Sequence, residues 1–176
     1  MSSHRALVSA SPTSIRPASQ PDVAAINKLV TANVGWGHLL PRSADDIQQH
    51  VPRFLVATRG SLVVGCGELA PLSNTLSEVR SLVVAADARG GGIGTGILAS
   101  LVATGRQQNV PRLCAFTHVP HPFVSLGFSI VPHTWLPEKI MTDCQECEWF
   151  RRCEQYAVVI ELNWGQSRPR GTARTI

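Results

Sequence analysis

The chain has 176 residues, of which 44% are hydrophobic and 16% are charged, and this size favours one compact domain over two. It lacks an apolar run of about 20 residues and an N-terminal secretion signal, so we expect a cytoplasmic protein with no membrane partner. The net charge of +4 comes largely from arginines near the C-terminus, which argues against a nucleic-acid partner, because such binding favours a basic stripe on an ordered face.

The spacing of apolar residues divides the chain into strand-like and helix-like segments. A period of two predicts a strand, and a spacing of three or four predicts a helix. Ser43 is expected to cap a helix, and Arg59 with Gly60 between two apolar runs indicates a hairpin. In chain order we predict a strand at 13–19, helices at 21–33 and 43–51, a hairpin at 54–72, a strand at 75–85, a helix at 92–109, a strand at 112–119, a short helix at 121–128, and strands at 128–132 and 156–164.

This order of elements is typical of an α/β (α+β) fold with a mixed sheet. Residues 1–13 and 164–176 are rich in Ser, Pro, Arg and Gly without a period, so both ends are predicted to be disordered. A single domain at 14–163 remains.

The segment 89–96 reads RGGGIGTG and lies between a predicted strand and a predicted helix. Main-chain N–H groups at such a junction point the same way, at the positive end of the helix dipole, and can bind phosphate. Glycines there remove the side chains that would keep a phosphate away from the main chain. No Lys-Ser or Lys-Thr follows, so the segment is not a Walker loop, and a tight turn without a ligand is the alternative.

Arg89, Gly92 and Gly94 match the pattern Arg/Gln-x-x-Gly-x-Gly/Ala, and the segment resembles the acetyl-CoA site of the GNAT superfamily of N-acetyltransferases. The resemblance runs from IRPAS to VSLGF. It implies a GNAT-type mixed, mostly antiparallel central sheet flanked by helices on both faces, with acetyl-CoA as co-substrate. The residues that it places at the cofactor are Leu82, Val83, Val84, Arg89, Gly90, Gly91, Gly92, Ile93, Gly94 and Thr95.

The resemblance also implies how the cofactor lies. The pantetheine arm would run along the strand 75–85 like an added strand, pairing with main chain at Leu82 and Val84, with the pyrophosphate on residues 89–95. The N–H of Val84 would face the thioester carbonyl, where one such donor lowers a barrier by roughly 3 kcal/mol.

Attack by an amine needs a group that accepts its proton. Glu78, six residues before Val84, has the spacing of the base in the histone-acetylating branch of the superfamily. Alternate residues of a strand share a face, so we expect Glu78, Arg80, Leu82 and Val84 on one face. Glu68 is the reserve base. The alternative for Glu78 is a surface ion pair with Arg80.

The sequence does not single out one residue as the acid that protonates the departing thiolate. Many members of the superfamily carry a Tyr just before their LGF-like element, whereas this chain has Phe123 there and its single tyrosine, Tyr156, elsewhere. His118, His121, Ser125 or water remain open for this role.

The acceptor is indicated by the C-terminal part of the chain. An LGF element, then Leu-Pro-x-Lys and Asp-Cys-x-x-Cys, resemble short, amino-acid-directed members similar to N-acetylglutamate synthases. This implies L-glutamate as acceptor and a role in arginine biosynthesis. Arg80 could hold one carboxylate of the glutamate with two N–H groups, and Lys139 could hold the other. Either cation could instead be an ordinary solvated side chain. Arg151 and Arg152 are reserve candidates for the same role.

Other acceptors remain open within the same fold: a polyamine, an aminoglycoside or a protein N-terminus. A non-catalytic acyl-CoA-binding regulatory domain is a further alternative, supported by the missing tyrosine. Trp36 lies where the superfamily usually has its acceptor lid. Members of the superfamily often dimerise, so a homodimer is also implied.

Three cysteines near the C-terminus raise the question of a metal. Cys144, Cys147 and Cys153 form C-x2-C-x5-C, which leaves the fourth position to His133 or to a group from outside the chain. A structural zinc ion requires four ligands, so this set is incomplete and we expect no metal.

Overall fold

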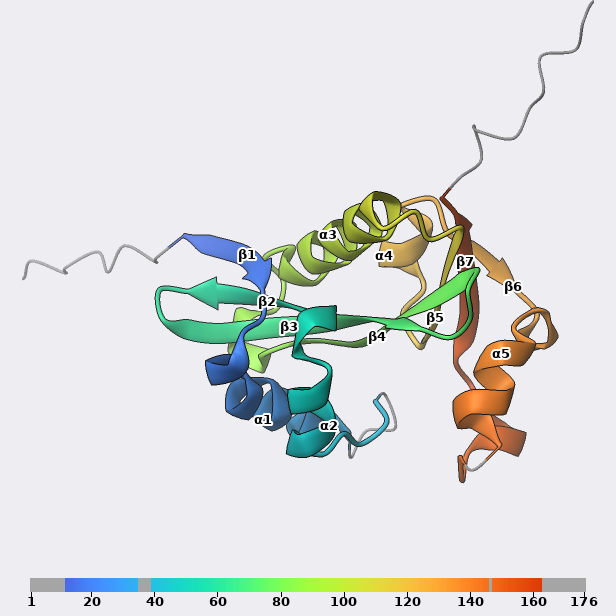
Figure 1. Cartoon of the computed structure of the whole chain (residues 1–176), viewed down its shortest axis with the longest axis horizontal. Coiled ribbons are helices and arrows are strands. Elements are labelled where there is room, and N and C mark those ends of the chain that lie inside the picture. Colours follow the sequence, from blue (N-terminus) through green and yellow to red (C-terminus); the bar gives the residue numbers. More distant parts are fainter. Residues whose placement is uncertain (1–11, 35–38, 146, 163–176) are drawn as a thin grey trace, which may run out of the picture.

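The computed structural model describes residues 12–34, 39–145 and 147–162. Within them, one sheet has the strand order β1-β2-β3-β4-β5-β7-β6 (Figure 1). Neighbouring strands are antiparallel except β4 and β5, which confirms the predicted mixed, mostly antiparallel sheet. The strands are β1 (Thr13–Pro17), β2 (Phe54–Arg59), β3 (Leu62–Pro71), β4 (Leu76–Val84), β5 (Arg112–Thr117), β6 (Ser129–Val131) and β7 (Tyr156–Glu161).

Helices cover both faces of the sheet, as predicted. Helices α1 (Val23–Val34) and α2 (Ala44–Gln49) lie on one face, and α3 (Ile93–Gln107) lies on the other (Figure 1). Their apolar stripes form separate cores, one around Ile26 and Ile47 and the other around Ile97 and the rest of the inner face of α3. Among the described residues, we find no helical segment with the length and apolar character that a membrane span needs.

Most local signals of the sequence act as expected. The Ser43 hydroxyl accepts a hydrogen bond from the N–H of Asp46 at 3.0 Å, so it caps α2. Gly60 adopts a positive φ of 58° in the hairpin turn between β2 and β3. Thr13, which belongs both to the predicted strand and to the predicted disordered N-terminus, pairs with Arg59 in the sheet. Both predicted disordered ends lie mostly outside the described residues.

The short helix predicted at 121–128 is present as α4 (His121–Val124), before β6. The segment between β6 and β7 was not assigned to any element. It forms short turns, in which α5 (Pro137–Lys139) continues into a π-helical turn, Ile140–Cys144. Two 3-10 turns, His133–Trp135 and Phe150–Arg152, flank that unit. Each turn is too short for its apolar residues to show a helical period, which explains why periodicity missed them.

An irregularity in β4 reverses the alternation of its side chains. Glu68 of β3 pairs with Arg80, but Cys66 pairs with Val83, so β4 has one extra residue between these pairs. Ser81 within this bulge adopts a φ of 52°. A bulge of this kind disrupts the ladder and redirects the following side chains.

The bulge corrects one prediction. Val83 packs in the core of α1, on the face of Arg80, whereas Leu82 and Val84 pack against the core of α3. The expectation that Glu78, Arg80, Leu82 and Val84 share a face is therefore wrong, because period-two counting does not hold across the extra residue.

The strands β4 and β5 separate after a short parallel contact. Only Leu76–Glu78 of β4 pair with residues of β5, although β4 continues to Val84 and β5 continues to Thr117. The C-terminal half of β4 therefore has no strand neighbour on this side within the described sheet.

Candidate active site

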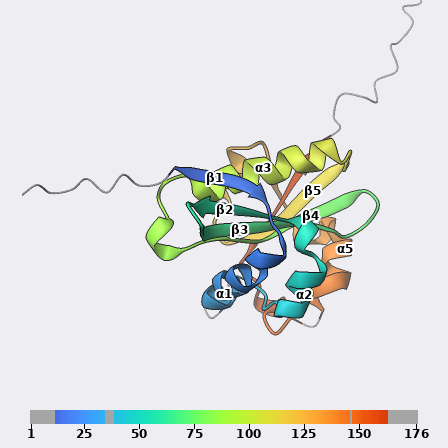
Figure 2. The same ribbon diagram turned by 60° about the vertical axis from the view of Figure 1, so that its left-hand side comes forward.

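A pocket of about 110 Å³ opens where β4 and β5 separate. Its wall combines the bulged part of β4, Phe116 of β5, the α5 region and the segment before α2. In both ribbon views, α2 and α5 lie below β4 (Figures 1 and 2). We call this cavity the β4–β5 pocket. It is lined by Leu39, Leu40, Arg42, Glu78, Val79, Arg80, Ser81, Phe116, His133, Lys139, Ile140, Asp143, Cys144, Cys147, Phe150, Cys153 and Gln155.

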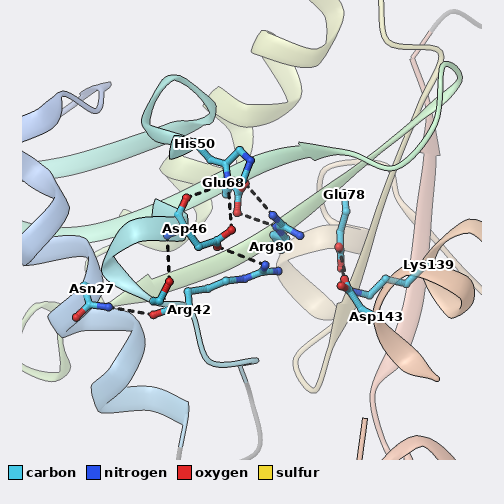
Figure 3. A network of polar contacts seen from close by, with 10 residues as sticks. Asn27, Arg42, Asp46, His50, Glu68, Glu78, Arg80, Lys139 and Asp143 are labelled. Atoms are coloured by element: carbon cyan, nitrogen blue, oxygen red, sulfur yellow. Dashed lines mark hydrogen bonds and ion pairs between the residues drawn. The ribbon is translucent and has the colours of Figure 1, made fainter. Parts of the chain in front are cut away.

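A buried ion-pair network lies at one side of this pocket. The Nζ of Lys139 lies 2.8 Å from Oε1 and 3.0 Å from Oε2 of Glu78, and 2.6 Å from Oδ2 of Asp143 (Figure 3). Glu78 is 2% exposed, and its burial raises the pKa of its carboxyl group against the opposing effect of Lys139. Burial alone would lower the pKa of Lys139, but the two carboxylates outweigh it and raise that pKa.

Arg80 forms its ion pair with Glu68 and not with Glu78, the partner considered from the sequence. Its Nε and Nη2 donate to the two oxygens of Glu68 at 2.7 and 3.0 Å, a bidentate pair in which Glu68 is almost fully buried (Figure 3). A surface pair between Glu78 and Arg80 is therefore excluded. Arg80 and Lys139, both predicted to hold acceptor carboxylates, are each already bound by carboxylates of the protein.

The glycine-rich loop has an open main chain. Gly90 and Gly92 adopt positive φ values of 81° and 75°, which a residue with a side chain rarely adopts, and Gly92 caps α3. A Cβ atom at either position would meet no atom within 4 Å, so the loop faces open space. Gly94 comes next to Val84, whose Cγ2 would be 3.6 Å from an added Cβ.

The main-chain N–H groups at the end of β4 alternate between its two edges. The N–H of Ala85 donates to the carbonyl of Val64 on β3 at 2.8 Å. In an antiparallel pair, successive N–H groups alternate between the two edges of a strand. The N–H of Val84 is therefore directed away from β3, toward the side on which β4 has separated from β5.

These features agree with a family match. A family model described as "Acetyltransferase (GNAT) family" matches residues 23–128, which include the bulged strand, the glycine-rich loop and α3. The chain belongs to the GNAT acetyltransferase family. It is an acetyl-CoA-dependent N-acetyltransferase.

Relatives of this GNAT protein include both short and long chains. An uncharacterised N-acetyltransferase of Chlorobaculum tepidum is 30% identical over 153 residues, covering 87% of this chain and 99% of that protein. The amino-acid acetyltransferase of Shewanella oneidensis is 30% identical over 135 residues, covering 76% of this chain but 30% of that protein. The solved N-acetylglutamate synthase of Neisseria gonorrhoeae, complexed with coenzyme A and N-acetyl-glutamate, has a TM-score of 0.75 at 25% identity, covering 86% of this chain and 35% of that one.

Two polar residues of the GNAT pocket were missed by sequence reasoning. Arg42 has its Nη1 3.5 Å from Oδ2 of Asp46, a longer and weaker contact than those of the other two cations (Figure 3). Its position depends on the packing of α1 against α2, including a hydrogen bond from Asn27 to its carbonyl at 3.0 Å, and no local pattern predicts this. Asp143 could have been found, because it follows Lys139 at the i,i+4 spacing of helical ion pairs.

Several of the other side chains that the sequence suggested for this acetyltransferase do not line the β4–β5 pocket. None of the three side chains considered as acid for the thiolate lines the β4–β5 pocket, and Ser125 donates its hydroxyl to the carbonyl of Pro122. Phe123 is buried against Phe128, and Tyr156 lies on β7. Neither reserve cation lines the pocket, and Trp36 lies outside the described residues.

Three of the five cysteines of this GNAT domain lie at the pocket. Cys144, Cys147 and Cys153 all line it as half-buried free thiols. His133 also lines it, but its Nε2 is 2.7 Å from the carbonyl of Gln155. In the ranges that the structure describes, no three His, Cys, Asp or Glu side chains are arranged to hold a metal ion.

Proposed function

We propose that this enzyme transfers the acetyl group of acetyl-CoA to the α-amino group of a free amino acid, L-glutamate, by direct attack in a ternary complex. The observation that carries the proposal is one pocket that combines a buried carboxylate, Glu78, with the guanidinium groups of Arg42 and Arg80. The named relatives, an amino-acid acetyltransferase and an N-acetylglutamate synthase, support the same acceptor class and a role in arginine biosynthesis.

The cofactor is proposed to lie in the opening between β4 and β5. Its pantetheine amides pair with main chain near Leu82 and Val84, and its diphosphate rests on the loop 89–95, where Gly90 and Gly92 leave open space. The N–H of Val84 then stabilises the oxygen of the thioester as it becomes an oxyanion. Val83 and Ile93 contribute by packing, because both side chains are buried.

Glu78 is proposed to be the general base. As the acceptor nitrogen forms its bond to the thioester carbon, Glu78 takes a proton from that nitrogen, and the C–S bond then breaks to release the CoA thiolate. A pKa raised by burial makes this carboxylate a better base than an exposed one. Lys139 opposes this rise in pKa and orients the carboxylate through contacts to both oxygens.

The acceptor carboxylates are assigned to Arg42 and Arg80 in preference to Lys139. Lys139 is held by two carboxylates, whereas Arg42, among the described residues, has only the longer contact to Asp46. Arg80 uses its Nε and Nη2 for Glu68, so its Nη1 is the group assigned to the acceptor. Net charge does not decide the acceptor, since the three cations of the pocket contact four carboxylates of the protein, Asp46, Glu68, Glu78 and Asp143. A polyamine would place further positive charge beside these guanidinium groups.

A panel of acceptors tests the proposal. Free-CoA release, read by thiol titration, is measured with acetyl-CoA and glutamate, other amino acids, polyamines and short peptides. Glutamate is expected to give the highest kcat/KM. Turnover of a cationic amine without turnover of any amino acid would make the acceptor assignment wrong, and CoA binding without any turnover would favour the regulatory alternative.

Arg42→Gln tests the carboxylate site directly. Loss of a charged hydrogen bond costs about 1.5–3 kcal/mol, so the KM for glutamate should rise about ten- to hundredfold, with kcat and the Kd for CoA nearly unchanged. Steady-state kinetics and calorimetry give these values. Arg106→Gln, at the exposed C-terminal end of α3, is the matched control. Equal KM values for the two variants would remove Arg42 from the site.

A further inference from the structure

The arginine of the glycine motif is engaged by the protein itself. Arg89 donates its Nε to the carbonyl of Val84 at 3.0 Å and its Nη2 to Oδ1 of Asn33 on α1 at 2.8 Å. These two bonds join the end of β4 to the end of α1. A guanidinium held in this way fixes the position of the main chain of β4. It is not directed at a ligand of the glycine-rich loop.

A second arginine reaches the loop from a distant part of the sequence. Arg59 ends β2 at the hairpin turn, and this turn lies on the same side of the molecule as the loop that leads into α3 (Figures 1 and 2). The Nη2 of Arg59 is 4.0 Å from the position that a Cβ atom on Gly91 would occupy. Among Gly90, Gly91 and Gly92, only the middle position has a side chain this close.

The contacts of Arg59 leave its charge available. Its Nε donates to the hydroxyl of Thr13 at 3.3 Å, which directs the rest of the guanidinium toward the loop. Within the part of the chain that the structure describes, Arg59 forms no ion pair with a carboxylate. A planar guanidinium with free N–H groups next to open main-chain N–H groups is a suitable partner for a phosphate group.

We propose that Arg59 is the cation that binds a phosphate group of acetyl-CoA at the glycine loop, and that Arg89 is a positioning residue for the end of β4. The inference rests on the proposed placement of the cofactor. The diphosphate and the 3′-phosphate of CoA offer the same chemistry to Arg59. Sequence alone favours Arg89, because only Arg89 belongs to the motif.

Calorimetric titration of the full chain with CoA tests the inference without any acceptor. Arg59→Gln is expected to weaken the Kd for CoA about ten- to hundredfold, and Arg59→Lys to weaken it less, because the charge is kept. Arg106→Gln, the exposed control, should leave the Kd unchanged. Circular dichroism and thermal unfolding check that each variant is folded.

Two further titrations refine the result. If the loss in Arg59→Gln disappears with 3′-dephospho-CoA, the partner is the 3′-phosphate, and if it persists, the partner is the diphosphate. Arg89→Gln should weaken CoA binding less than Arg59→Gln but lower kcat with glutamate, because the N–H of Val84 is displaced. A Kd for Arg59→Gln within twofold of the wild type overturns this inference but not the proposed cofactor placement. A larger loss of CoA affinity in Arg89→Gln than in Arg59→Gln has the same consequence. A wild-type chain that does not bind CoA overturns the cofactor placement as well.

Discussion

Glu78→Gln is expected to lower kcat by about a hundred- to ten-thousandfold, the usual contribution of a positioned general base. The amide keeps the shape of the side chain but cannot accept a proton from the attacking amine. The Kd for CoA should stay within about twofold of the wild type, because the proposed phosphate contacts lie at the other end of β4. Steady-state CoA release and calorimetry measure the two effects separately. The variant should fold, since Lys139 keeps Asp143 as a partner at 2.6 Å.

The pH dependence gives an independent signature of the same group. A base acts only when it is deprotonated, so kcat/KM should rise with pH through the pKa of Glu78. Burial raises this pKa, and the acidic limb of the profile should therefore lie above the value of about 4.3 that an exposed glutamate has. Glu78→Gln should lose that limb.

Glu138→Gln provides the matched control for this variant. Glu138 lies on α5 next to Lys139 but does not line the β4–β5 pocket, and its charged contact is to Arg112 at 3.7 Å. Its kcat should remain within about twofold of the wild type. If Glu78→Gln retains more than a tenth of the wild-type kcat, Glu78 is not the base.

The fold could be predicted because its signals are local. Apolar periodicity, the Ser43 cap and the turn at Gly60 each depend on a few neighbouring residues, and the structure contains the expected cap and turn. The glycine loop is equally local, since positive φ values at Gly90 and Gly92 require a residue without a side chain.

The site could be predicted only in part, because its geometry depends on contacts between distant segments. Glu78, Arg80 and Lys139 line one pocket, but the ion pairs that they form with Glu68 and Asp143 were not predicted. One extra residue at the bulge of β4 changes which side chains share a face, and strand periodicity contains no sign of it. Arg42 and Arg59 were missed because tertiary packing alone brings them to the pocket and to the loop.

Lys139→Met is expected to lower the free energy of unfolding by about 3–5 kcal/mol at neutral pH, as when one partner of a buried ion pair is removed. Methionine preserves most of the apolar length of lysine, so the loss is mainly electrostatic. Glu78 would be left charged while only 2% exposed, whereas Asp143 can reach solvent more easily. Urea unfolding followed by circular dichroism gives the difference in free energy.

The pH dependence of this loss has a defined sign. Without Lys139, burial raises the folded-state pKa of Glu78 further above its unfolded value of about 4.3. The folded state then binds more protons than the unfolded state above that value, so stability falls as pH rises and recovers as pH is lowered toward 4. The double variant Lys139→Met/Glu78→Gln removes both charges and should regain more than half of the lost free energy. A loss in Lys139→Met that is independent of pH and persists in the double variant would show that packing, and not the buried charge of Glu78, makes Lys139 necessary.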